Sequence, residues 1–298
     1  MTKTVNKTPR LLILDGNHIA YRAYYKFKNL KTMDGKNTAI VFGIPRIIES
    51  LIRKMMSPDK VILVFDGGRS DHRKDILPSY KAREQKLGFD RDDFLEQREQ
   101  AMYAMGNLGL SIVYKRGFEA DDLIALIIKK HPNYHKIIVS GDKDFNQLIS
   151  PDTDVFNVGK NITYNLVNFK KSLGFEPHQT VDYLSLTGDS SDNIPGYPGI
   201  GEKRAIDFLS KFGSIRNFLR STEKFGKTDK ILLSEIASRN KKLIDLKYYY
   251  RKYLIRMEIP YLDIEISFPK FKRYCAVNET NSFLKPQFFK TFKYLSHE

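Results

Sequence analysis

The chain of 298 residues contains a single cysteine, Cys275, and no long hydrophobic run. One cysteine excludes intrachain disulfides and cysteine-rich zinc sites, and it fits a reducing compartment. No apolar run approaches the roughly 20 residues needed to span a bilayer, and the basic N-terminus leads only to the short run 11–14 before Asp15. We therefore expect a soluble protein with no secretory signal and no membrane partner.

Positive charge is what the sequence has in excess. It has 50 Lys and Arg against 35 Asp and Glu, a formal net charge of +15, and residues 201–298 alone carry a net +10. A basic region with scattered tyrosines and phenylalanines suits a polyanion, because each neutralised phosphate releases condensed counterions. A lysine-rich solvated surface explains the same charge. Charge alone therefore leaves both a nucleic-acid partner and a plain soluble surface open.

Three short apolar runs each lead to an aspartate. They are 11–14 before Asp15, 61–65 before Asp66, and 137–140 before Asp142. Stretches with helical spacing lie between them, at 44–56, 91–108 and 120–130. This alternation predicts an α/β fold, with a mostly parallel central sheet flanked by helices. Ligands of such sheets bind beyond the carboxyl ends of the strands, where these aspartates fall.

The pattern changes near residue 175, after which strand signals fade. We expect two domains, an α/β core at 1–174 and a helical region at 175–298 that ends in a basic segment. A glycine turn at 196–201 opens a helix near Lys203, as in helix–hairpin–helix elements that hold a nucleic-acid backbone. Any loop that needs positive φ would use the same glycines. The charged stretch 67–100 is expected to form a binding loop or lid, or else a solvated excursion.

Nine acidic residues gather near the predicted strand ends and helix starts: Asp15, Asp66, Glu119, Asp121, Asp122, Asp142, Asp144, Asp189 and Asp192. Singly, each is explained by a helix cap or an Asx turn. On one rim of the sheet, however, so many carboxylates cannot all stay ionised without cations between them. Oxygen ligands favour Mg²⁺ or Mn²⁺ over zinc. Two such ions in an acidic cleft of a basic protein suit phosphodiester hydrolysis.

An ordered set of motifs between Leu11 and Asp263 resembles the 5′-nuclease family. That family includes the N-terminal nuclease domain of bacterial DNA polymerase I and the free-standing bacteriophage 5′-exonucleases, also called flap endonucleases. The motifs are LDGN at 14–17, YRAY at 21–24, VFD at 64–66, YK at 80–81, GFEADD at 117–122, SGDKD at 140–144, GDSSDNIPG at 188–196 and GIGEK at 199–203.

The resemblance implies a 5′→3′ exonuclease and structure-specific 5′ flap endonuclease that acts in replication or repair. Its substrates would be DNA with 5′ flaps, nicks or ends, and RNA primers on DNA. It implies a PIN-like core with a helical arch at about 67–100 and a helix-three-turn-helix region at about 180–220. A separate DNA polymerase is an expected partner, and the cytoplasm of a bacterial cell or phage-infected host is the expected location.

The resemblance also implies residue roles. It assigns one metal region to Asp15, Asp66, Glu119, Asp121 and Asp122, and a second to Asp142, Asp144, Asp189 and Asp192. Lys81 and Arg22 match positions that contact the scissile phosphate, and Tyr80 matches one that stacks on DNA. The family's second basic arch position is Glu84 here, so Arg83 is the candidate replacement. Duplex DNA, with K⁺ at the turn, would be held through Gly199, Gly201, Lys203 and Arg204.

Other enzyme classes fit less well. A haloacid-dehalogenase-type phosphatase needs a second aspartate where Asn17 stands, and the sequence has no GxxxxGK[ST] phosphate-binding loop. A PIN-type ribonuclease stays open, although it would not need the helical region after Gly188. A non-catalytic DNA-structure binding protein also stays open, although an inactive relative would be expected to lose some of the carboxylates.

Overall fold

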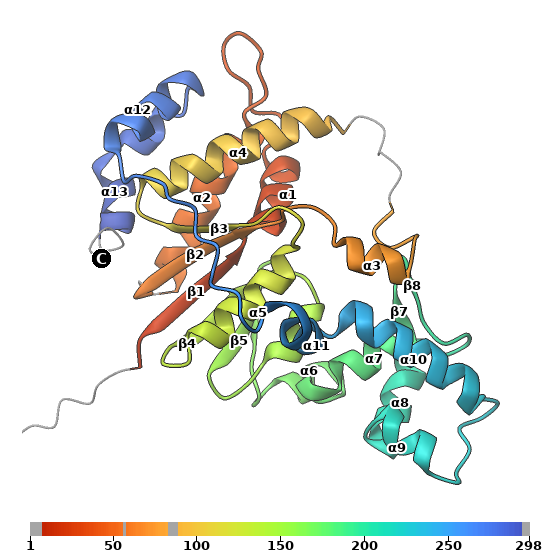
Figure 1. Cartoon of the computed structure of the whole chain (residues 1–298). Helices are drawn as coiled ribbons and strands as arrows, with labels where there is room; N and C mark the ends of the chain where they lie inside the picture. Colours follow the sequence, from red (N-terminus) through yellow and green to blue (C-terminus); the bar gives the residue numbers. More distant parts are fainter. Residues whose placement is uncertain (1–7, 56–57, 83–88, 294–298) are drawn as a thin grey trace, which may run out of the picture.

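A six-stranded sheet forms the centre of the computed structural model, which describes residues 8–55, 58–82 and 89–293. The strand order is β3-β2-β1-β4-β5-β6, and every neighbouring pair is parallel except β5 and β6 (Figure 1). The strands are β1 (Arg10–Asp15), β2 (Lys60–Phe65), β3 (Ser111–Tyr114), β4 (His135–Val139), β5 (Thr153–Asn157) and β6 (Ile162–Tyr164). The predicted α/β fold with a mostly parallel sheet is confirmed.

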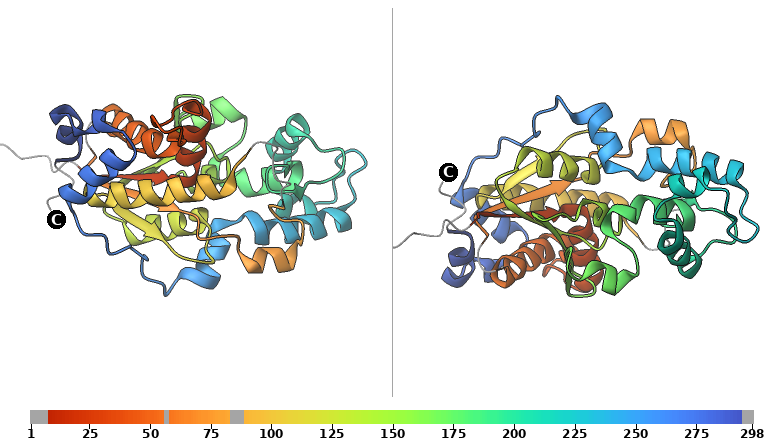
Figure 2. Two further views of the ribbon diagram at one scale, coloured as in Figure 1. Left: turned by 90° about the horizontal axis from the view of Figure 1, so that it is seen from above. Right: turned by 90° about the horizontal axis from the view of Figure 1, so that it is seen from below.

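Helices cover both faces of the sheet, which explains why its central strands contain runs of consecutive apolar residues. In β1, Leu12 and Leu14 join one core cluster while Leu11 and Ile13 join the other, and all four are fully buried. The first cluster includes α1 (Gly16–Lys26), α2 (Ala39–Lys54) and α4 (Arg91–Asn107), whereas the second includes α5 (Ala120–Lys130). Figure 2 shows helices on either side of the sheet.

A helical region follows the sheet and lies beyond the carboxyl ends of its strands. It contains α6 (Phe169–Leu173), η2 (Pro177–Gln179), α7 (Thr180–Thr187), the hairpin β7 (Gly188–Asp189) and β8 (Ile194–Pro195), α8 (Glu202–Phe212), α9 (Ile215–Arg220) and α10 (Lys230–Ile244). The turn η1 (Asp144–Leu148) comes earlier, between β4 and β5. Helix α7 packs against α8 and α10. Helices α8 and α9 lie at the end of the molecule farthest from the C-terminal helices (Figure 1).

The C-terminal segment returns to the sheet, which differs from the expected single helical region at 175–298. After α11 (Leu246–Tyr249) and the π-helical turn η3 (Tyr250–Leu254), the amide of Leu262 donates to the carbonyl of Ile112 in β3 at 2.8 Å. The last helices are α12 (Phe268–Val277), η4 (Asn281–Leu284) and α13 (Pro286–Phe292). Their buried phenylalanines, Phe271, Phe283, Phe288 and Phe292, join the core of the first sheet face, which fixes the segment there.

The charged stretch 67–100 is partly helical. It contains α3 (Asp71–Ile76), a turn through Lys81 and the first half of α4. Residues 83–88, and with them the candidate Arg83, lie outside the described residues. Helix α3 lies beside α10, next to the β7–β8 hairpin (Figure 1). None of the helices in the described ranges has the length and apolar character needed to cross a membrane.

Candidate active site

Five short segments place the predicted acidic residues at the carboxyl edge of the sheet. Asp15 ends β1, Asp66 follows β2, residues 119–122 begin α5, residues 142–144 follow β4, and residues 189–192 form the β7–β8 hairpin. Electrostatic interactions between carboxylates connect all five segments. The fold therefore brings together acids that are widely separated in the sequence.

Asp15 is fixed by hydrogen bonds to both carboxylate oxygens. The amide of His18 donates to Oδ1 at 2.9 Å, which caps α1, and the hydroxyl of Ser140 donates to Oδ2 at 2.7 Å. Burial raises the pKa of Asp15 to about 7, and the nearby charges of Asp66 and Asp142 act in the same direction. The site therefore holds this carboxyl in place but disfavours its charged form.

Asp66 is oriented by the start of α5. The amide of Ala120 donates to its Oδ1 at 2.6 Å, and the side-chain amide of Asn17 donates to its Oδ2. Asn17 is positioned in turn by Arg98, whose Nη1 donates to the Asn17 oxygen at 3.1 Å. Burial raises the pKa of Asp66, although Lys81 opposes this shift. Neither Asn17 nor Arg98 was predicted to support the site, because each reaches it from a different helix.

The second group of acids follows β4 and lines the hairpin. The Asp142 Oδ1 accepts a hydrogen bond from the amide of Asp144 at 2.9 Å, and Lys143 lies 3.2 Å from the Asp189 carboxylate. Asp189 also accepts a hydrogen bond from the amide of Ser191 at 2.8 Å. Burial raises the pKa of Asp144 well above its usual value, and the Asp142 charge adds to this. The Oδ1 atom of Asp144 is buried and has no hydrogen-bond partner within the described ranges.

These features fit a hard divalent cation. Burial, followed by neighbouring carboxylates, also raises the pKa of Asp121 well above its usual value, so several acids here resist ionisation together. The donor atoms are oxygens, and one buried oxygen of Asp144 is unsatisfied. The residues that the structure describes include no group of three His, Cys, Asp or Glu side chains already set around a single metal position. A cation would therefore have to draw the carboxylates together.

Lys81 lies inside this group of acids. Its Nζ is 2.5 Å from Glu119, 3.6 Å from Asp192 and 4.0 Å from Asp121. Burial alone would lower the pKa of Lys81, but Glu119 and then Asp121 outweigh burial and raise it well above its usual value. The lysine is therefore a fixed positive charge at the place where the carboxylates meet.

The β7–β8 hairpin holds the turn that carries Lys81. The amide of Lys81 donates to the carbonyl of Asp192 at 3.0 Å. The side-chain amide of Asn193 donates to the carbonyls of Ser79, at 3.0 Å, and Ala82. Both Lys81 and Asn193 have positive φ, 49° and 57°. Sequence reasoning did not assign a role to Asn193, although it lies within the GDSSDN motif.

Glu119 is held in its ionised form. Its carboxylate accepts hydrogen bonds from the Ser70 amide at 3.1 Å and the Tyr80 hydroxyl at 2.9 Å. Burial alone would raise the pKa of Glu119, but Lys81 and Arg73 outweigh it and lower the pKa to about 2. Tyr80, which was expected to stack on DNA, is instead only 3% exposed. Its ring packs in an apolar cluster with residues of α7, β8 and α10.

Asp122 is bound by a buried arginine. Arg73 donates to its two oxygens at 2.7 Å each and to the carbonyl of Leu243 at 2.9 Å. The Arg73 guanidinium also lies 3.5 Å from Glu119 and 4.4 Å from the ring centre of Tyr249. Arg73 was not predicted, because its partner lies 49 residues away in the sequence. Asp122 therefore joins α5 to α3 through Arg73.

Arg22 and His18 lie at the same edge of the site on α1. Burial lowers the pKa of His18, Asp142 opposes this shift, and the Arg22 charge adds to it. The imidazole packs on Gly141, where a Cβ atom would lie 2.5 Å from the ring. Arg22 is partly buried and lies close enough to His18 for its charge to act on that imidazole, and its role at the reacting phosphate stays a prediction.

The glycine turn precedes α8 as expected. Gly199 has a φ of 75°, Gly201 is the residue at the start of α8, and Lys203 is exposed. The first amides of α8 are of the kind that bind phosphates. Arg204 is also exposed, but its Nη1 donates to the carbonyl of Gly199 at 2.7 Å, and its guanidinium lies 5.5 Å from the ring centre of Phe225. The turn therefore presents Lys203 outward and uses Arg204 to brace itself.

Comparison with known proteins places the chain among nucleases. Residues 10–174 match the 5′-3′ exonuclease N-terminal resolvase-like domain, and residues 175–260 match the 5′-3′ exonuclease C-terminal SAM fold. A 5′-3′ exonuclease of Aquifex aeolicus is 32% identical over 282 residues, which cover 92% of this chain and 94% of that protein. DNA polymerase I of Mycobacterium bovis is 35% identical over 250 residues, which cover 80% of this chain but only 27% of the polymerase.

A solved structure shares the fold. The bacteriophage T5 flap endonuclease, in a complex with DNA and metal ions, has a TM-score of 0.69 and 23% identity, covering 91% of this chain and 99% of that one. The Aquifex relative aligns over nearly the full length of both proteins, and the two domain matches together run from residue 10 to residue 260. This chain therefore belongs to the 5′-3′ exonuclease family of nucleases.

Proposed function

We propose that this chain hydrolyses phosphodiester bonds in DNA, 5′→3′ from ends and nicks and at the base of 5′ flaps. The observation that carries the proposal is the gathering of buried carboxylates around Lys81, with raised pKa values for Asp15, Asp121 and Asp144. RNA primers paired to DNA are proposed substrates as well, because the carboxylates and Lys81 would act on the phosphodiester rather than on the sugar.

Two divalent cations, Mg²⁺ or Mn²⁺, are the proposed cofactors. Bound cations would lower the pKa of the attacking water and stabilise the leaving oxygen. One would be held by Asp15, Asp66, Glu119 and Asp121, and the other by Asp142, Asp144, Asp189 and Asp192. Asp122 acts through Arg73 by keeping α3 in place.

The basic residues of the site act on the substrate phosphate. The Lys81 ammonium lies among the carboxylates, whose negative charge would otherwise repel a phosphate. It would also offset the negative charge that develops on the transferring phosphoryl group. Arg22 provides a second positive charge from α1. Glu119 holds Lys81 until the substrate arrives, because it accepts the hydrogen bond from the ammonium.

Duplex DNA would be held away from the chemistry, at the glycine turn. The amides at the start of α8 and the exposed Lys203 would contact one phosphate backbone. A K⁺ ion there would have to share the Gly199 carbonyl with Arg204. The family relation to the nuclease part of DNA polymerase I supports a DNA polymerase as the proposed partner.

The test is product mapping on a DNA duplex with one 5′ flap, incubated with Mg²⁺ or with EDTA. We expect cleavage near the base of the flap, products with 5′ phosphates, and no cleavage in EDTA. Asp144→Asn should abolish cleavage but leave DNA binding intact. The matched control is Asp182→Asn. Burial also raises the pKa of Asp182, but its carboxylate accepts a hydrogen bond from the amide of Ile215 in α9 and is not one of the proposed metal ligands.

Three results would contradict the proposal. Binding of flap DNA without cleavage at saturating Mg²⁺ and Mn²⁺ would indicate a non-catalytic DNA-structure binding protein. Equal cleavage of unstructured RNA and flap DNA would indicate a ribonuclease of the PIN type. Equal activity of the Asp144→Asn and Asp182→Asn variants would place the reaction outside the carboxylate site.

A further inference from the structure

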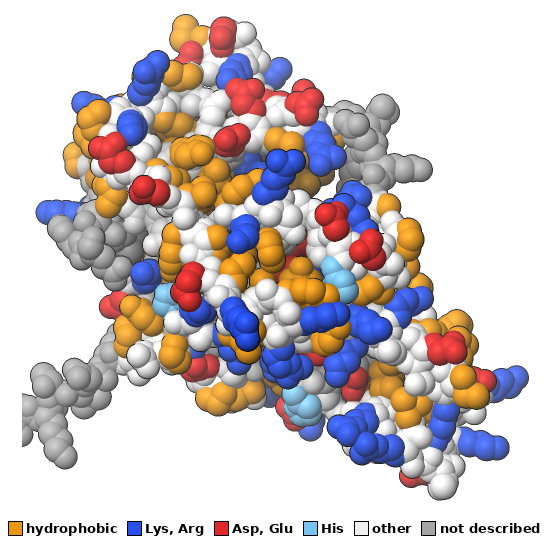
Figure 3. All heavy atoms as spheres, in the orientation of Figure 1, with side chains coloured by type: hydrophobic (Ala, Val, Ile, Leu, Met, Phe, Trp, Pro, Cys, Tyr) orange, Lys and Arg blue, Asp and Glu red, His pale blue; other side chains and the backbone are white. Residues whose placement is uncertain are grey.

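A basic and aromatic surface lies outside the carboxylate site, at the end of α10 and in the turns that follow. Residues 241–256 contain six lysines and arginines, four tyrosines and one acid, Asp245. Asp245 is buried and caps α11 by accepting a hydrogen bond from the Tyr248 amide at 2.9 Å. All six basic side chains are exposed. Figure 3 shows lysine and arginine side chains gathered over α10 and α11.

The π-helical turn η3 shapes this surface. Leu254 is fully buried and anchors the turn, whereas Arg251, Lys252 and Tyr253 are exposed one after another. π-Helical turns are rare, and they recur at functional sites because the extra residue changes which side chains face outward. Here the turn presents two positive charges beside an aromatic ring.

Helix α3 completes the surface with His72. The Tyr253 and His72 ring centres are 4.7 Å apart, and their hydroxyl and Nε2 atoms are 2.7 Å apart. The Lys252 ammonium lies 5.1 Å from the Tyr253 ring centre. Burial lowers the pKa of His72, and the charges of Lys252, Arg73 and Lys242 act in the same direction while that of Asp75 opposes them, so both lysines lie near this imidazole. Tyr253 keeps 37% of its surface exposed.

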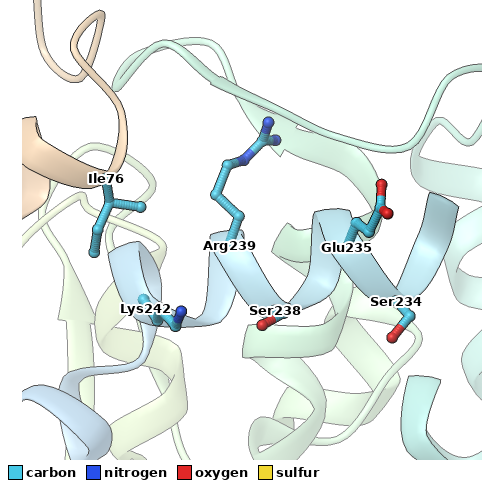
Figure 4. A pocket seen from close by; sticks show the side chains of 6 residues that line it. All are labelled: Ile76, Ser234, Glu235, Ser238, Arg239 and Lys242. Atoms are coloured by element: carbon cyan, nitrogen blue, oxygen red, sulfur yellow. The ribbon is translucent and has the colours of Figure 1, made fainter. Parts of the chain in front are cut away.

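A groove extends the surface between α3 and α10. Ile76 from α3 faces Arg239 and Lys242 on α10 across it (Figure 4). Arg239 is fixed there because its Nη2 donates to the carbonyl of Pro195 at 2.8 Å. Glu235 lines the opposite part of the groove, so the positive charge is concentrated at the end that meets η3. We call His72, Lys242, Arg251, Lys252 and Tyr253 the α3–η3 patch.

Two side chains in contact, Arg73 and Tyr249, connect the carboxylate site to this patch. Arg73 contacts Glu119 on one side, at 3.5 Å, and stacks on Tyr249 on the other, at 4.4 Å from the ring centre. Tyr249 in turn lies 4.7 Å from Tyr253, ring centre to ring centre. A nucleic-acid strand that continues past the carboxylates and around α3 would therefore reach the patch within a few nucleotides.

We propose that the α3–η3 patch binds single-stranded nucleic acid, namely the 5′ single-stranded arm of the flap substrate beyond the bond that is cut. This inference rests on the proposed function. Exposed positive charges contact phosphates, and exposed rings stack on unpaired bases. A duplex offers no unstacked base to Tyr253, so lysines alone would serve a duplex. The combination of ring and charge selects the single strand.

The experiment compares the affinities of full-length variants for two DNAs in EDTA, by fluorescence anisotropy. One DNA is a nicked duplex, and the other is the same duplex with a 5′ single-stranded flap of about 20 nucleotides, longer than the span of a typical single-strand site. The patch variant is Lys242→Ala/Arg251→Ala/Lys252→Ala. The control variant is Lys129→Ala/Lys171→Ala/Lys272→Ala. It removes the same number of positive charges from exposed lysines on α5, α6 and α12.

We expect the patch variant to bind flap DNA about tenfold more weakly and the control variant to bind it normally. The salt slope for the flap should fall by about 2, as expected for three lost contacts to a single strand. Binding of the nicked duplex should not change. Tyr253→Leu should weaken flap binding about fivefold, whereas Tyr253→Phe, which keeps the ring, should not.

Three outcomes would overturn the inference. The patch and control variants could weaken flap binding equally, the nicked duplex could lose as much affinity as the flap DNA, or neither DNA could lose affinity, as for a surface that binds a protein. Thermal unfolding of each variant separates lost binding from lost folding. Wild-type cleavage of the same flap tests the proposed function separately, because the binding assay gives its answer whether or not cleavage occurs.

Discussion

The buried Arg73–Asp122 pair should contribute to stability by an amount that follows from its contacts. Asp122 is fully buried, and Arg73 is 2% exposed. Their two hydrogen bonds of 2.7 Å join α5 to α3, and the bond from Arg73 to Leu243 joins α3 to α10. Removing one partner of such a pair leaves a buried charge without its counter-charge, which costs about 3–5 kcal/mol of unfolding free energy.

We therefore expect Asp122→Ala and Arg73→Met each to lower the unfolding free energy by about 3–5 kcal/mol, a large share of the roughly 5–15 kcal/mol typical of a folded domain. The double variant Arg73→Met/Asp122→Leu leaves no unpaired charge of this pair. Its cost should be well below the sum of the single costs, with a coupling free energy of about 3 kcal/mol or more.

Urea unfolding followed by circular dichroism measures these free energies. The matched control is Lys130→Met, which breaks an ion pair of 2.7 Å to a Glu258 side chain that is 87% exposed. Such surface pairs contribute at most about 1 kcal/mol. If Asp122→Ala cost no more than this control, or if the double variant cost the full sum, the reasoning about the buried pair would be refuted.

Three further outcomes are expected. Asn193→Ala should slow single-turnover cleavage about tenfold, with little change in DNA affinity, because the turn that positions Lys81 loses two hydrogen bonds; an unchanged rate would contradict this. Without divalent ions, stability should fall as the pH rises from about 4 to about 7, since the folded-state pKa values of Asp15, about 7, and Asp192, about 6, exceed the usual 3.8 and the folded chain therefore binds more protons. Mg²⁺ should then raise the melting temperature more at pH 8 than at pH 5, and an equal rise would count against carboxylate binding. Lys203→Ala should reduce the salt slope of duplex binding by about 0.9, whereas an unchanged slope would place the duplex elsewhere.

The sequence predicted the sheet and the gathering of acids for the same reason. Apolar runs that end at Asp15 and Asp66 are buried parallel strands, and the carboxyl ends of parallel strands share one edge. This rule holds whatever the details of packing. It placed acids from segments more than 100 residues apart at one site without any knowledge of their contacts.

The parts that could not be predicted depend on long-range packing. Nothing near Arg73 in the sequence marks it as the partner of Asp122, and nothing near Tyr80 indicates that residues of α7, β8 and α10 bury its ring. The return of α12 and α13 to the sheet depends on phenylalanines such as Phe288, which read equally well as part of a basic aromatic tail. Periodicity shows which face of a helix is apolar but not which neighbour covers it.

The central claim is that the carboxylates hold divalent cations, and crystals soaked in Mn²⁺ test it most directly. At saturating Mn²⁺, anomalous scattering should reveal one ion beside Asp15, Asp66 and Asp121 and another beside Asp142, Asp144 and Asp189. The Asp144 oxygen that now has no hydrogen-bond partner among the described residues should become a ligand. An anomalous map without peaks among these carboxylates would contradict the account.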